Sequence, residues 1–354
     1  MSAHRKRAAV TEIGARKAEH LDIVLNRDVR TQGKSAGFDL IDFEHCALPE
    51  LDLDAIDLST TFLGRALKAP VLVSSMTGGP ARAASINLAI AEAAGRLGIG
   101  FAVGSQRIAL ESDATAGFDR RLRDVAGPMP ILANFGAAQL RRWNVPDMAR
   151  RAVDMIDADG LIIHLNPLQE AVQEGGDRDW SGLLTRIEVL ARATPRPLIV
   201  KEVGGGISGA LARRLWNAGV GIIDVAGAGG TSWAAVEAER ATNLRARAVA
   251  DAFRGWGIPT VEALRQVCAA CPQAVVIASG GVRDGVEAAK ALTLGATLVG
   301  QAAGVLGAAL TGADAVVEHM AIFIEQLRIA CFCTGSANLA ALRRARLLPL
   351  AGKA

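Results

Sequence analysis

A lysine inside a strongly apolar stretch is the first residue whose type calls for a chemical explanation. Lys201 follows Leu198, Ile199 and Val200 and precedes Glu202. Neighbouring residues of a strand point to opposite faces, so Glu202 is not a natural partner for this ammonium group. Because an unpaired buried ammonium is costly, we expect Lys201 to face an anion or an electron-rich ring of a ligand.

Glycine pairs late in the chain could hold a phosphate. Gly280 and Gly281 stand just ahead of Arg283, and Gly300 precedes Gln301. Glycine-rich turns between a strand and a helix present backbone N–H groups that can cradle a phosphate. The alternative is that these glycines only form tight turns. Two such loops, one of them followed by an arginine, favour the phosphate.

Polar residues after a further apolar run offer metal and acid–base chemistry. His164 and Asn166 share the parity of one strand and should face the interior of the fold together, although a lone strand histidine is more often a core residue. Gln169 and Glu170 follow just beyond. A carboxylate beside phosphate-binding loops commonly anchors Mg²⁺. The alternative for Glu170 is an acid that only stabilises a helix N-terminus.

The numbers of tyrosines and cysteines exclude some reaction mechanisms and some kinds of cysteine site. The chain has no tyrosine, which excludes any mechanism that needs a tyrosine acid, base or nucleophile. Its five cysteines fit a reducing compartment better than a disulfide framework. Four of them, Cys268, Cys271, Cys331 and Cys333, could supply zinc thiolates. Since the first pair ends an apolar helical pattern and runs into Pro272, buried structural thiols are the better interpretation.

Composition limits the partners. The chain has 354 residues and a formal net charge of +3, which argues against a dedicated nucleic-acid-binding protein. Hydrophobic residues make up 51%, which excludes a disordered chain. No apolar stretch approaches the ~20 residues that span a bilayer, and no apolar segment of a secretory signal follows the basic residues 4–7. We therefore expect a soluble, cytoplasmic protein with neither a membrane nor a nucleic-acid partner.

The elements that must position these residues recur after residue 65. Eight short apolar runs alternate with helical patterns, and they are Val71–Ser74, Gly100–Val103, Ile131–Ala133, Gly160–His164, Leu198–Lys201, Ile222–Val225, Val275–Ala278 and Thr297–Val299. Near-continuous apolar runs are typical of parallel strands covered on both faces, and the helical patterns include Ala81–Leu97, Asp147–Ile156 and Gly209–Ala218. Eight such units in series predict an α/β fold of the (β/α)₈ TIM barrel type. An open doubly wound sheet is the alternative, but glycines spread over many loops favour the barrel.

We predict that the whole chain forms a single domain. We predict an N-terminal extension over residues 1–65 that folds over the barrel and its mouth, a barrel core over 66–310, and a C-terminal helix and tail over 311–354. The basic tail from Leu342 onward should fray. In barrels of this kind the site forms at the carboxyl ends of the strands, where the residues described above fall.

Seven short motifs, taken in order, resemble those of type 2 isopentenyl-diphosphate isomerases. They are Arg16-Lys17-Ala-Glu-His20, Ser75-Met76-Thr77-Gly-Gly, Gly104-Ser105-Gln106-Arg107, His164-Leu-Asn166-Pro-Leu-Gln169-Glu170, Gly175-Gly-Asp177-Arg178-Asp179-Trp, Lys201-Glu-Val-Gly-Gly-Gly and Gly229-Gly-Thr231-Ser-Trp. Each motif alone is modest, but their joint order along nearly the whole chain is highly specific. The resemblance implies a flavin-binding barrel that uses FMN, NADPH and Mg²⁺ to interconvert isopentenyl and dimethylallyl diphosphate, and a homo-oligomer, either a tetramer or an octamer.

The same resemblance implies roles for individual residues. Substrate-binding residues would be Arg16, Lys17, Ser105, Arg107 and Gln169, with the cations clamping the diphosphate. Cofactor-binding residues would be Ser75, Met76, Thr77, Ser105, Asn134, Lys201, Thr231, Gly280, Gly281, Val282, Gln301 and Ala302. Catalytic side chains would be His164, Asn166 and Gln169, and the metal ligand would be Glu170.

The implied reaction is a 1,3-proton shift across an unactivated alkene. Because these residues include no evident acid–base pair, a reduced flavin would supply both proton transfers while the barrel orients the substrate. NADPH would reduce the flavin without being consumed in each turnover. The rivals are another FMN-dependent barrel oxidoreductase and a non-catalytic flavin-binding barrel. Oxidases that rely on tyrosine are disfavoured, and a scaffold has no use for Arg16, Lys17, Arg107 and Glu170 together.

Overall fold

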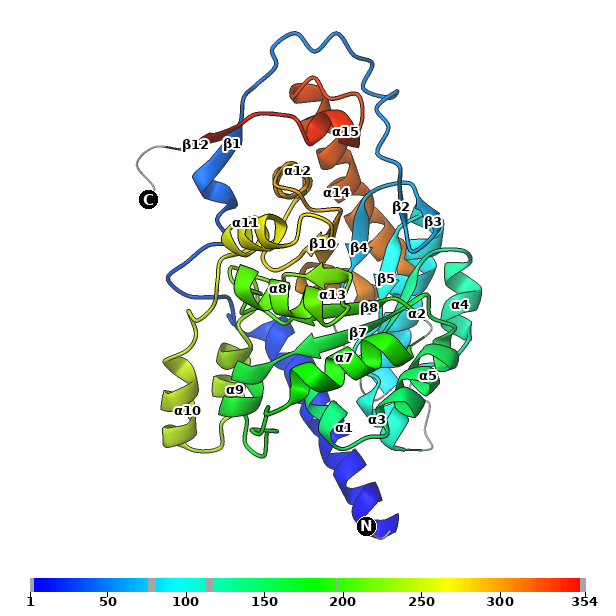
Figure 1. Ribbon diagram of the computed structural model, residues 1–354, viewed down its shortest axis with the longest axis vertical. Coiled ribbons are helices and arrows are strands. Elements are labelled where there is room, and N and C mark those ends of the chain that lie inside the picture. Colours follow the sequence, from blue (N-terminus) through cyan, green and yellow to red (C-terminus); the bar gives the residue numbers. More distant parts are fainter. Residues whose placement is uncertain (1–2, 76–80, 113–116, 195, 351–354) are drawn as a thin grey trace.

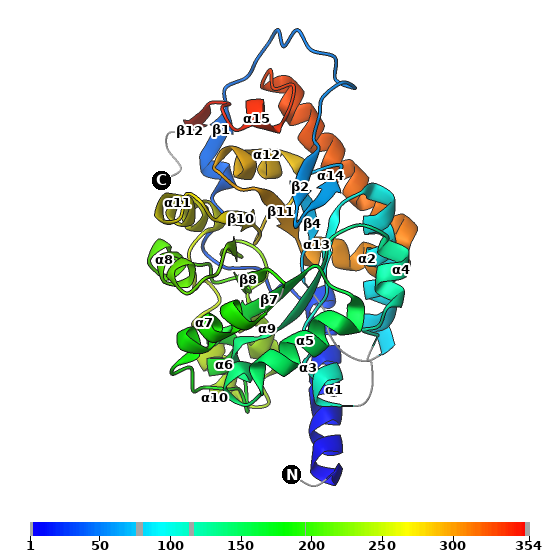
Figure 2. The same cartoon turned by 45° about the vertical axis from the view of Figure 1, so that its right-hand side comes forward.

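The computed structural model describes residues 3–75, 81–112, 117–194 and 196–350. Parallel strands close into a barrel in the order β10-β11-β4-β5-β6-β7-β8-β9 (Figures 1 and 2). The strands are β4 Val71–Val73, β5 Gly100–Ala102, β6 Ile131–Gly136, β7 Gly160–Leu165, β8 Leu198–Glu202, β9 Ile222–Asp224, β10 Val275–Ala278 and β11 Leu298–Gln301. Each predicted run forms one strand, and the predicted (β/α)₈ fold is confirmed.

Helices follow the strands and surround the barrel (Figure 2). They are α2 Ala81–Leu97, α3 Arg107–Glu111, α4 Arg121–Ala126, α5 Val145–Ile156, α6 Pro167–Val172, α7 Leu183–Ala193, α8 Gly209–Asn217, α9 Trp233–Arg240, α10 Leu244–Asp251, α11 Thr260–Ala270, α12 Gly285–Thr293, α13 Ala303–Thr311, α14 Ala313–Cys333 and α15 Leu339–Leu342. The side chains of Ser208, Ser232 and Asp284 cap α8, α9 and α12 by accepting a hydrogen bond from the first turn. Within the described part of the chain, no helix is long and apolar enough to cross a membrane.

The inside of the barrel changes from apolar to polar along its strands. One apolar layer takes a residue from each strand: Leu72, Ala102, Leu132, Ile162, Ile199, Ile222, Ile277 and Leu298. Since strand side chains alternate with a period of two, the next inward residue stands two positions further along. Those positions hold Ser74, Gly104, Asn134, His164, Lys201, Asp224, Ser279 and Gly300. The polar layer therefore lies toward the carboxyl ends of the strands, where barrels carry their sites.

The N-terminal extension covers one end of the barrel with a long helix. This helix, α1 (Ala3–Asn26), packs against α3, α9 and α13. The chain after it bonds to the loop that follows β9: Thr31 N donates to Gly230 O at 2.8 Å, and Ser232 N donates to Val29 O at 2.7 Å. The expectation that the extension covers the mouth is met by these residues.

A hairpin that starts in the same extension and ends two residues past its predicted end closes the opposite end of the barrel. Its strands, β2 (Thr60–Phe62) and β3 (Arg65–Leu67), pair antiparallel. Phe62 and Leu67 are buried against the apolar layer of the barrel. The extension thus seals the amino ends of the strands, a role that the sequence analysis did not predict.

The C-terminal tail is held by a strand pair. Residues Leu347–Pro349 form β12, which pairs antiparallel with β1 (Ile41–Phe43) (Figure 1). The expectation that the tail frays is wrong for these residues. Their backbone groups bond to a segment near the other end of the chain, a partner that the local sequence of the tail does not reveal.

Candidate active site

A cavity of about 560 Å³ lies at the carboxyl end of the barrel, beside α1. It brings together the site residues that the sequence predicts. Those that line it are Arg16, Lys17, Ser75, Ser105, Arg107, Asn134, His164, Asn166, Gln169, Glu170, Lys201, Thr231, Gly280, Gly281, Val282, Gln301 and Ala302. Two further predicted residues, Met76 and Thr77, lie outside the described part of the chain.

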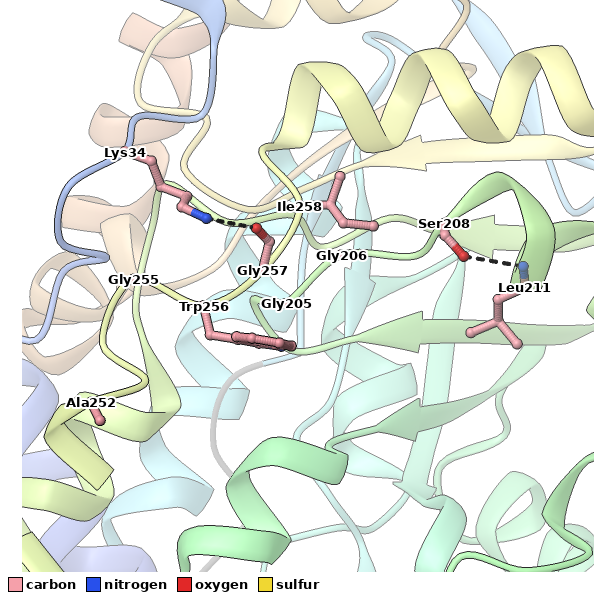
Figure 3. Close-up of a pocket in the computed structure, with 10 residues that line it drawn as sticks. All are labelled: Lys34, Gly205, Gly206, Ser208, Leu211, Ala252, Gly255, Trp256, Gly257 and Ile258. Carbon is pink, nitrogen blue, oxygen red and sulfur yellow. Dashed lines mark hydrogen bonds between the residues drawn. The ribbon is translucent and has the colours of Figure 1, made fainter. Parts of the chain in front are cut away.

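A second hollow, of about 600 Å³, lies outside the barrel between the loop after β8 and the segment before α11 (Figure 3). Its polar side chains have partners within the protein: Lys34 Nζ donates to Gly257 O at 3.0 Å, and Ser208 Oγ accepts from Leu211 N at 3.2 Å. Trp256 is 64% exposed beside them. The described residues that line this hollow include no carboxylate, histidine or cysteine. We therefore place the candidate active site in the barrel cavity.

Lys201 is buried in the polar layer of the barrel. It is 6% exposed, and its ammonium donates to Glu202 O at 2.6 Å. In register with it on β9 stands Asp224, whose carboxylate accepts from Ser279 Oγ at 2.6 Å. Burial raises the pKa of Asp224, although the Lys201 charge works against that rise. Since an ammonium has three N–H donors, Lys201 keeps donors for a ligand, and the expectation that it faces one stays a prediction.

The sequence analysis missed Asp224. The signal was present, because Asp224 interrupts an apolar strand in the same way as Lys201 does. The pairing of β8 with β9 places the two charges in register, so each reduces the cost of burying the other.

Three cations meet at the edge of the cavity, on α1 and α3. Lys17 Nζ donates to Ser105 O at 2.9 Å. Burial, together with the charges of Arg107 and Arg16, lowers the pKa of Lys17 to about 7. Burial and the Arg107 charge also lower the pKa of Arg16. A cluster of this kind suits a ligand that carries several negative charges, because such a ligand relieves the repulsion among the cations.

Acidic neighbours hold Arg107 in place. Its Nε lies 3.3 Å from a Glu111 carboxylate oxygen, and its Nη1 lies 3.6 Å from Asp177 Oδ2. Asp177 also pairs with Arg142, and its backbone N–H donates to Glu170 Oε2 at 2.7 Å. Asp177 therefore links the cation cluster to the predicted metal ligand.

His164 is neutral in this environment. Burial and three nearby cations lower its pKa to about 3. Its Nδ1 lies 2.9 Å from Asn134 Oδ1, and Asn134 Nδ2 donates to Val103 O at 3.1 Å. The amide oxygen of Asn134 thus accepts from Nδ1–H, which leaves Nε2 of His164 as an acceptor. A histidine in this state positions a ligand but does not act as a strong acid at neutral pH.

Glu170, the predicted metal ligand, is buried in the first turn of α6. Its Oε1 accepts from Asn166 Nδ2 at 3.2 Å, and the same amide donates to Gln169 Oε1 at 3.1 Å. Among the residues that the structure describes, no cluster of three or more His, Cys, Asp or Glu side chains forms a metal site. A metal here would take Glu170 as its protein ligand and complete its shell with water and phosphate oxygens, as Mg²⁺ does.

A second buried acid lies beside Gln169. Glu237, on α9, is 3% exposed, accepts from Gln169 Nε2 at 3.0 Å and from Arg240 Nη1 at 2.6 Å, and lies 2.9 Å from His20 Nε2. Burial alone would raise the pKa of Glu237, but these partners outweigh burial and lower it. The sequence analysis missed this acid, whose signal was a carboxylate among the alanines of α9.

The loop after β10 has the backbone geometry of an anion cradle. Gly280 has φ of 93° and Gly281 has φ of 70°, and a Cβ at Gly280 would lie 2.2 Å from Gly227 O. These conformations require glycine. Within the described residues, the N–H groups of Gly280, Gly281 and Val282 have no hydrogen-bond acceptor. They line the cavity and suit a phosphate.

Further polar atoms in the cavity fit an FMN-sized ligand with a ring, a hydroxylated chain and a phosphate. Among the described residues, the buried Oγ atoms of Ser74 and Ser75 and the Oδ1 of Asn166 have no hydrogen-bond partner. Arg283 adds less to the phosphate site than its place in the sequence indicates, because its 71% exposed side chain pairs with Glu287.

Comparisons with known proteins define the class. The model of FMN-dependent dehydrogenases matches residues 10–117 and 104–349. Among solved structures, mandelate oxidase with (S)-2-phenylpropionate matches with a TM-score of 0.65 and 19% identity over 96% of this chain and 98% of that chain, a likeness of fold. The chain is a (β/α)₈ barrel of the FMN-dependent dehydrogenase class.

Closer relatives specify the family within that class. Isopentenyl-diphosphate delta-isomerase of Stutzerimonas stutzeri (strain A1501) is 62% identical over 95% of this chain and 97% of the relative. The protein of the same name from Cronobacter sakazakii (strain ATCC BAA-894) is 59% identical over the same shares. The chain belongs to the type 2, FMN-dependent isopentenyl-diphosphate delta-isomerase family, which confirms the resemblance seen in the motifs.

Proposed function

We propose that this protein interconverts isopentenyl diphosphate and dimethylallyl diphosphate with FMN as its cofactor. The carrying observation is that one cavity contains both the cation cluster of Arg16, Lys17 and Arg107 and the backbone cradle at Gly280–Val282. FMN alone needs the cradle but not the cations, which suit a second ligand that carries a diphosphate. The activity named for a relative that is 62% identical supports this assignment.

The residues of the chain bind and orient in this proposal. Reduced FMN, when bound, supplies the proton transfers. The cation cluster binds the diphosphate, and Gln169, held by Glu237, borders the hydrocarbon part of the substrate. Neutral His164 with Asn166 orients the reactants, because a histidine with a pKa of about 3 does not protonate an alkene at neutral pH.

The number of product molecules formed per NADPH oxidised tests the reaction class. Anaerobic protein with oxidised FMN, Mg²⁺ and isopentenyl diphosphate should be idle. A catalytic amount of NADPH or dithionite should then start many turnovers, since the flavin ends each turnover still reduced. In deuterated water the product should gain deuterium. A ratio fixed at one product per NADPH would instead identify an FMN-dependent oxidoreductase.

Magnesium enters the proposal through Glu170. Glu170→Gln keeps the shape of the side chain but removes the charge that a hard cation prefers. We expect Mg²⁺ to tighten inorganic pyrophosphate binding to the wild type and to have little effect on the variant, with the flavin spectrum unaltered in both. Glu174→Gln is the matched control, because Glu174 is exposed and bonds to Thr242. Full activity of the wild type in EDTA would contradict the metal role.

Assembly and location complete the proposal. We propose a homo-oligomer, either a tetramer or an octamer as the resemblance implies, in the cytoplasm, where the cysteines stay reduced. Light scattering during size-exclusion chromatography gives the particle mass as a multiple of the 36.8 kDa chain. A monomer at micromolar concentration would contradict the assembly.

A further inference from the structure

The Gln301 side chain, at the end of β11, is committed to contacts within the protein. It is 4% exposed, and its Nε2 donates to Arg283 O at 3.1 Å and to Val282 O at 3.3 Å. Its Oε1 lies 2.6 Å from His319 Nε2. Both amide N–H donors and the amide oxygen are therefore engaged. Gln301 serves the cavity by holding the loop after β10 rather than by offering its side chain to a ligand.

His319 fixes the direction of this amide. Because Gln301 Nε2 faces two carbonyl oxygens, Oε1 is the acceptor and His319 Nε2–H is the donor. An imidazole at this position keeps the amide from flipping, since a flip would point Oε1 at the two carbonyls. His319 also lines the cavity, so the C-terminal helix α14 reaches the candidate site.

A second contact from α14 supports the same loop. Gln326 Oε1 accepts from Gly285 N at 2.9 Å, where α12 begins. A Cβ at Gly285 would lie 2.3 Å from Phe323 O, so the two helices approach closely there. The segment that carries the unpaired N–H groups of Gly280, Gly281 and Val282 is therefore held at its far end by α14 directly, and nearer the cavity through Gln301.

We propose that His319 is a positioning residue for the phosphate group of the flavin. Through Gln301 it holds the carbonyl groups of Val282 and Arg283, so that the free N–H groups of the adjoining Gly280–Val282 segment converge on one phosphate. This role rests on the proposed FMN cofactor and adds a residue of α14 to the site. It predicts that His319 acts on the phosphate and not on the isoalloxazine ring.

Comparison of FMN with riboflavin, which lacks the phosphate, tests the role. Flavin-free protein is titrated with each ligand, and the quenching of flavin fluorescence gives Kd. We expect His319→Ala to weaken FMN binding by about tenfold and to leave riboflavin binding within about twofold of the wild type. His319→Gln, whose amide N–H can donate to Gln301 Oε1, should restore most of the FMN affinity. His45→Ala, at an exposed histidine, is the matched control.

Three other results would overturn the role of His319 or of the proposed cofactor. Equal loss of FMN and riboflavin affinity in His319→Ala would make His319 a merely structural residue, and unchanged FMN affinity would also overturn the role. If His319→Ala does not fold, Gln301→Glu provides the test, because a carboxylate facing two carbonyl oxygens should displace the loop and weaken FMN selectively. Failure of the wild type itself to bind FMN would overturn the proposed cofactor, a result distinct from an effect confined to the variants.

Discussion

Lys17 is a partly buried residue whose charged neighbours on α1 and α3 are mainly cations. Its pKa of about 7 lies well below the ordinary value of 10.5, so near pH 8 most molecules carry a neutral amine there. A diphosphate bound at this place favours the charged form and draws a proton onto Lys17. We therefore expect diphosphate binding in the proposed site to be coupled to proton uptake at this side chain.

We predict that inorganic pyrophosphate binding at pH 8 takes up about one proton per site through Lys17. Isothermal titration in buffers of different ionisation enthalpy measures the uptake. Lys17→Arg should bind pyrophosphate with little uptake, because a guanidinium stays charged. Lys34→Met replaces an exposed lysine that donates to Gly257 O, and this variant should keep the proton uptake of the wild type. Equal uptake in Lys17→Arg would assign the proton to another group.

The depressed pKa also has a consequence for stability. Between pH 7 and 10.5 the unfolded chain holds a proton on Lys17 that the folded chain has released, so this site makes the protein more stable as the pH rises through that window. His164 acts in the same direction at lower pH, between its folded pKa of about 3 and the ordinary value of 6.5. Below its ordinary pKa, each group therefore lowers the stability of the folded protein, because the folded chain binds the proton less readily than the unfolded chain.

At the scale of the elements, a buried ion cluster connects a helix and several strands at the end of the barrel opposite the cavity. Asp159, just before β7, accepts from Arg65 Nη2 at 2.9 Å on β3 and from Arg123 Nη2 at 2.6 Å on α4. It also accepts from Ile131 N at 3.0 Å, at the start of β6. Burial alone would raise the pKa of Asp159, but these hydrogen bonds outweigh burial and lower it. One carboxylate thus connects the β2–β3 hairpin, the helix α4 and the neighbouring strands β6 and β7.

We predict that Asp159→Asn lowers the free energy of unfolding by about 3 kcal/mol, because it leaves two arginines without their buried partner. Urea unfolding at pH 7 measures the loss. The wild-type advantage is present above the ordinary aspartate pKa and disappears as the pH falls through the lowered one, so the two proteins should converge in acid. Asp157→Asn, at a less buried neighbour that pairs with Arg120, should cost less than about 0.5 kcal/mol. A pH-independent difference would mean that packing, not charge, is lost.

At the scale of the whole molecule, the barrel strands and two of the proposed substrate-binding residues come from separate parts of the chain. The barrel strands start only at Val71, whereas Arg16 and Lys17 lie on α1. The first half of α1 extends beyond the barrel in Figure 2. The paired strands of the barrel, the β2–β3 hairpin and the Gly280–Val282 cradle are all formed by residues that follow α1.

We therefore predict that removal of residues 1–27 leaves a cooperatively unfolding protein that binds FMN but has lost pyrophosphate binding by at least about a hundredfold, because two of the three cations are gone. Fluorescence titration with FMN and calorimetric titration with pyrophosphate measure the two affinities separately. The double variant Arg16→Gln, Lys17→Gln, with the helix kept, is the matched control and should show the same separation. Loss of FMN binding together with pyrophosphate binding would show that α1 also builds the cofactor site.

The strand positions and the inward layer were predictable because both depend on local periodicity. Side-chain alternation puts Lys201, His164 and Asn134 at inward positions of their own strands, and strand pairing in the barrel brings them onto one surface. The turn at Gly280 and Gly281 could also be predicted, since only glycine adopts their backbone conformation without strain. The family resemblance then added Arg16 and Lys17, which precede the barrel and follow no strand.

The amino-acid sequence by itself determined the barrel and its eight strands, because backbone preference and side-chain alternation act between near neighbours. The family resemblance added most of the predicted residues that line the cavity. Only the tertiary structure decided which charges meet. Asp224 reaches the surroundings of Lys201 through strand pairing, Glu237 meets His20 across two helices, and His319 reaches Gln301 from the C-terminal helix. The strand pair β1–β12 likewise joins segments about 300 residues apart. Electrostatic and hydrogen-bond energies depend on distance in space, so the pKa of Lys17, the neutrality of His164 and the orientation of Gln301 follow only once the chain has closed around them.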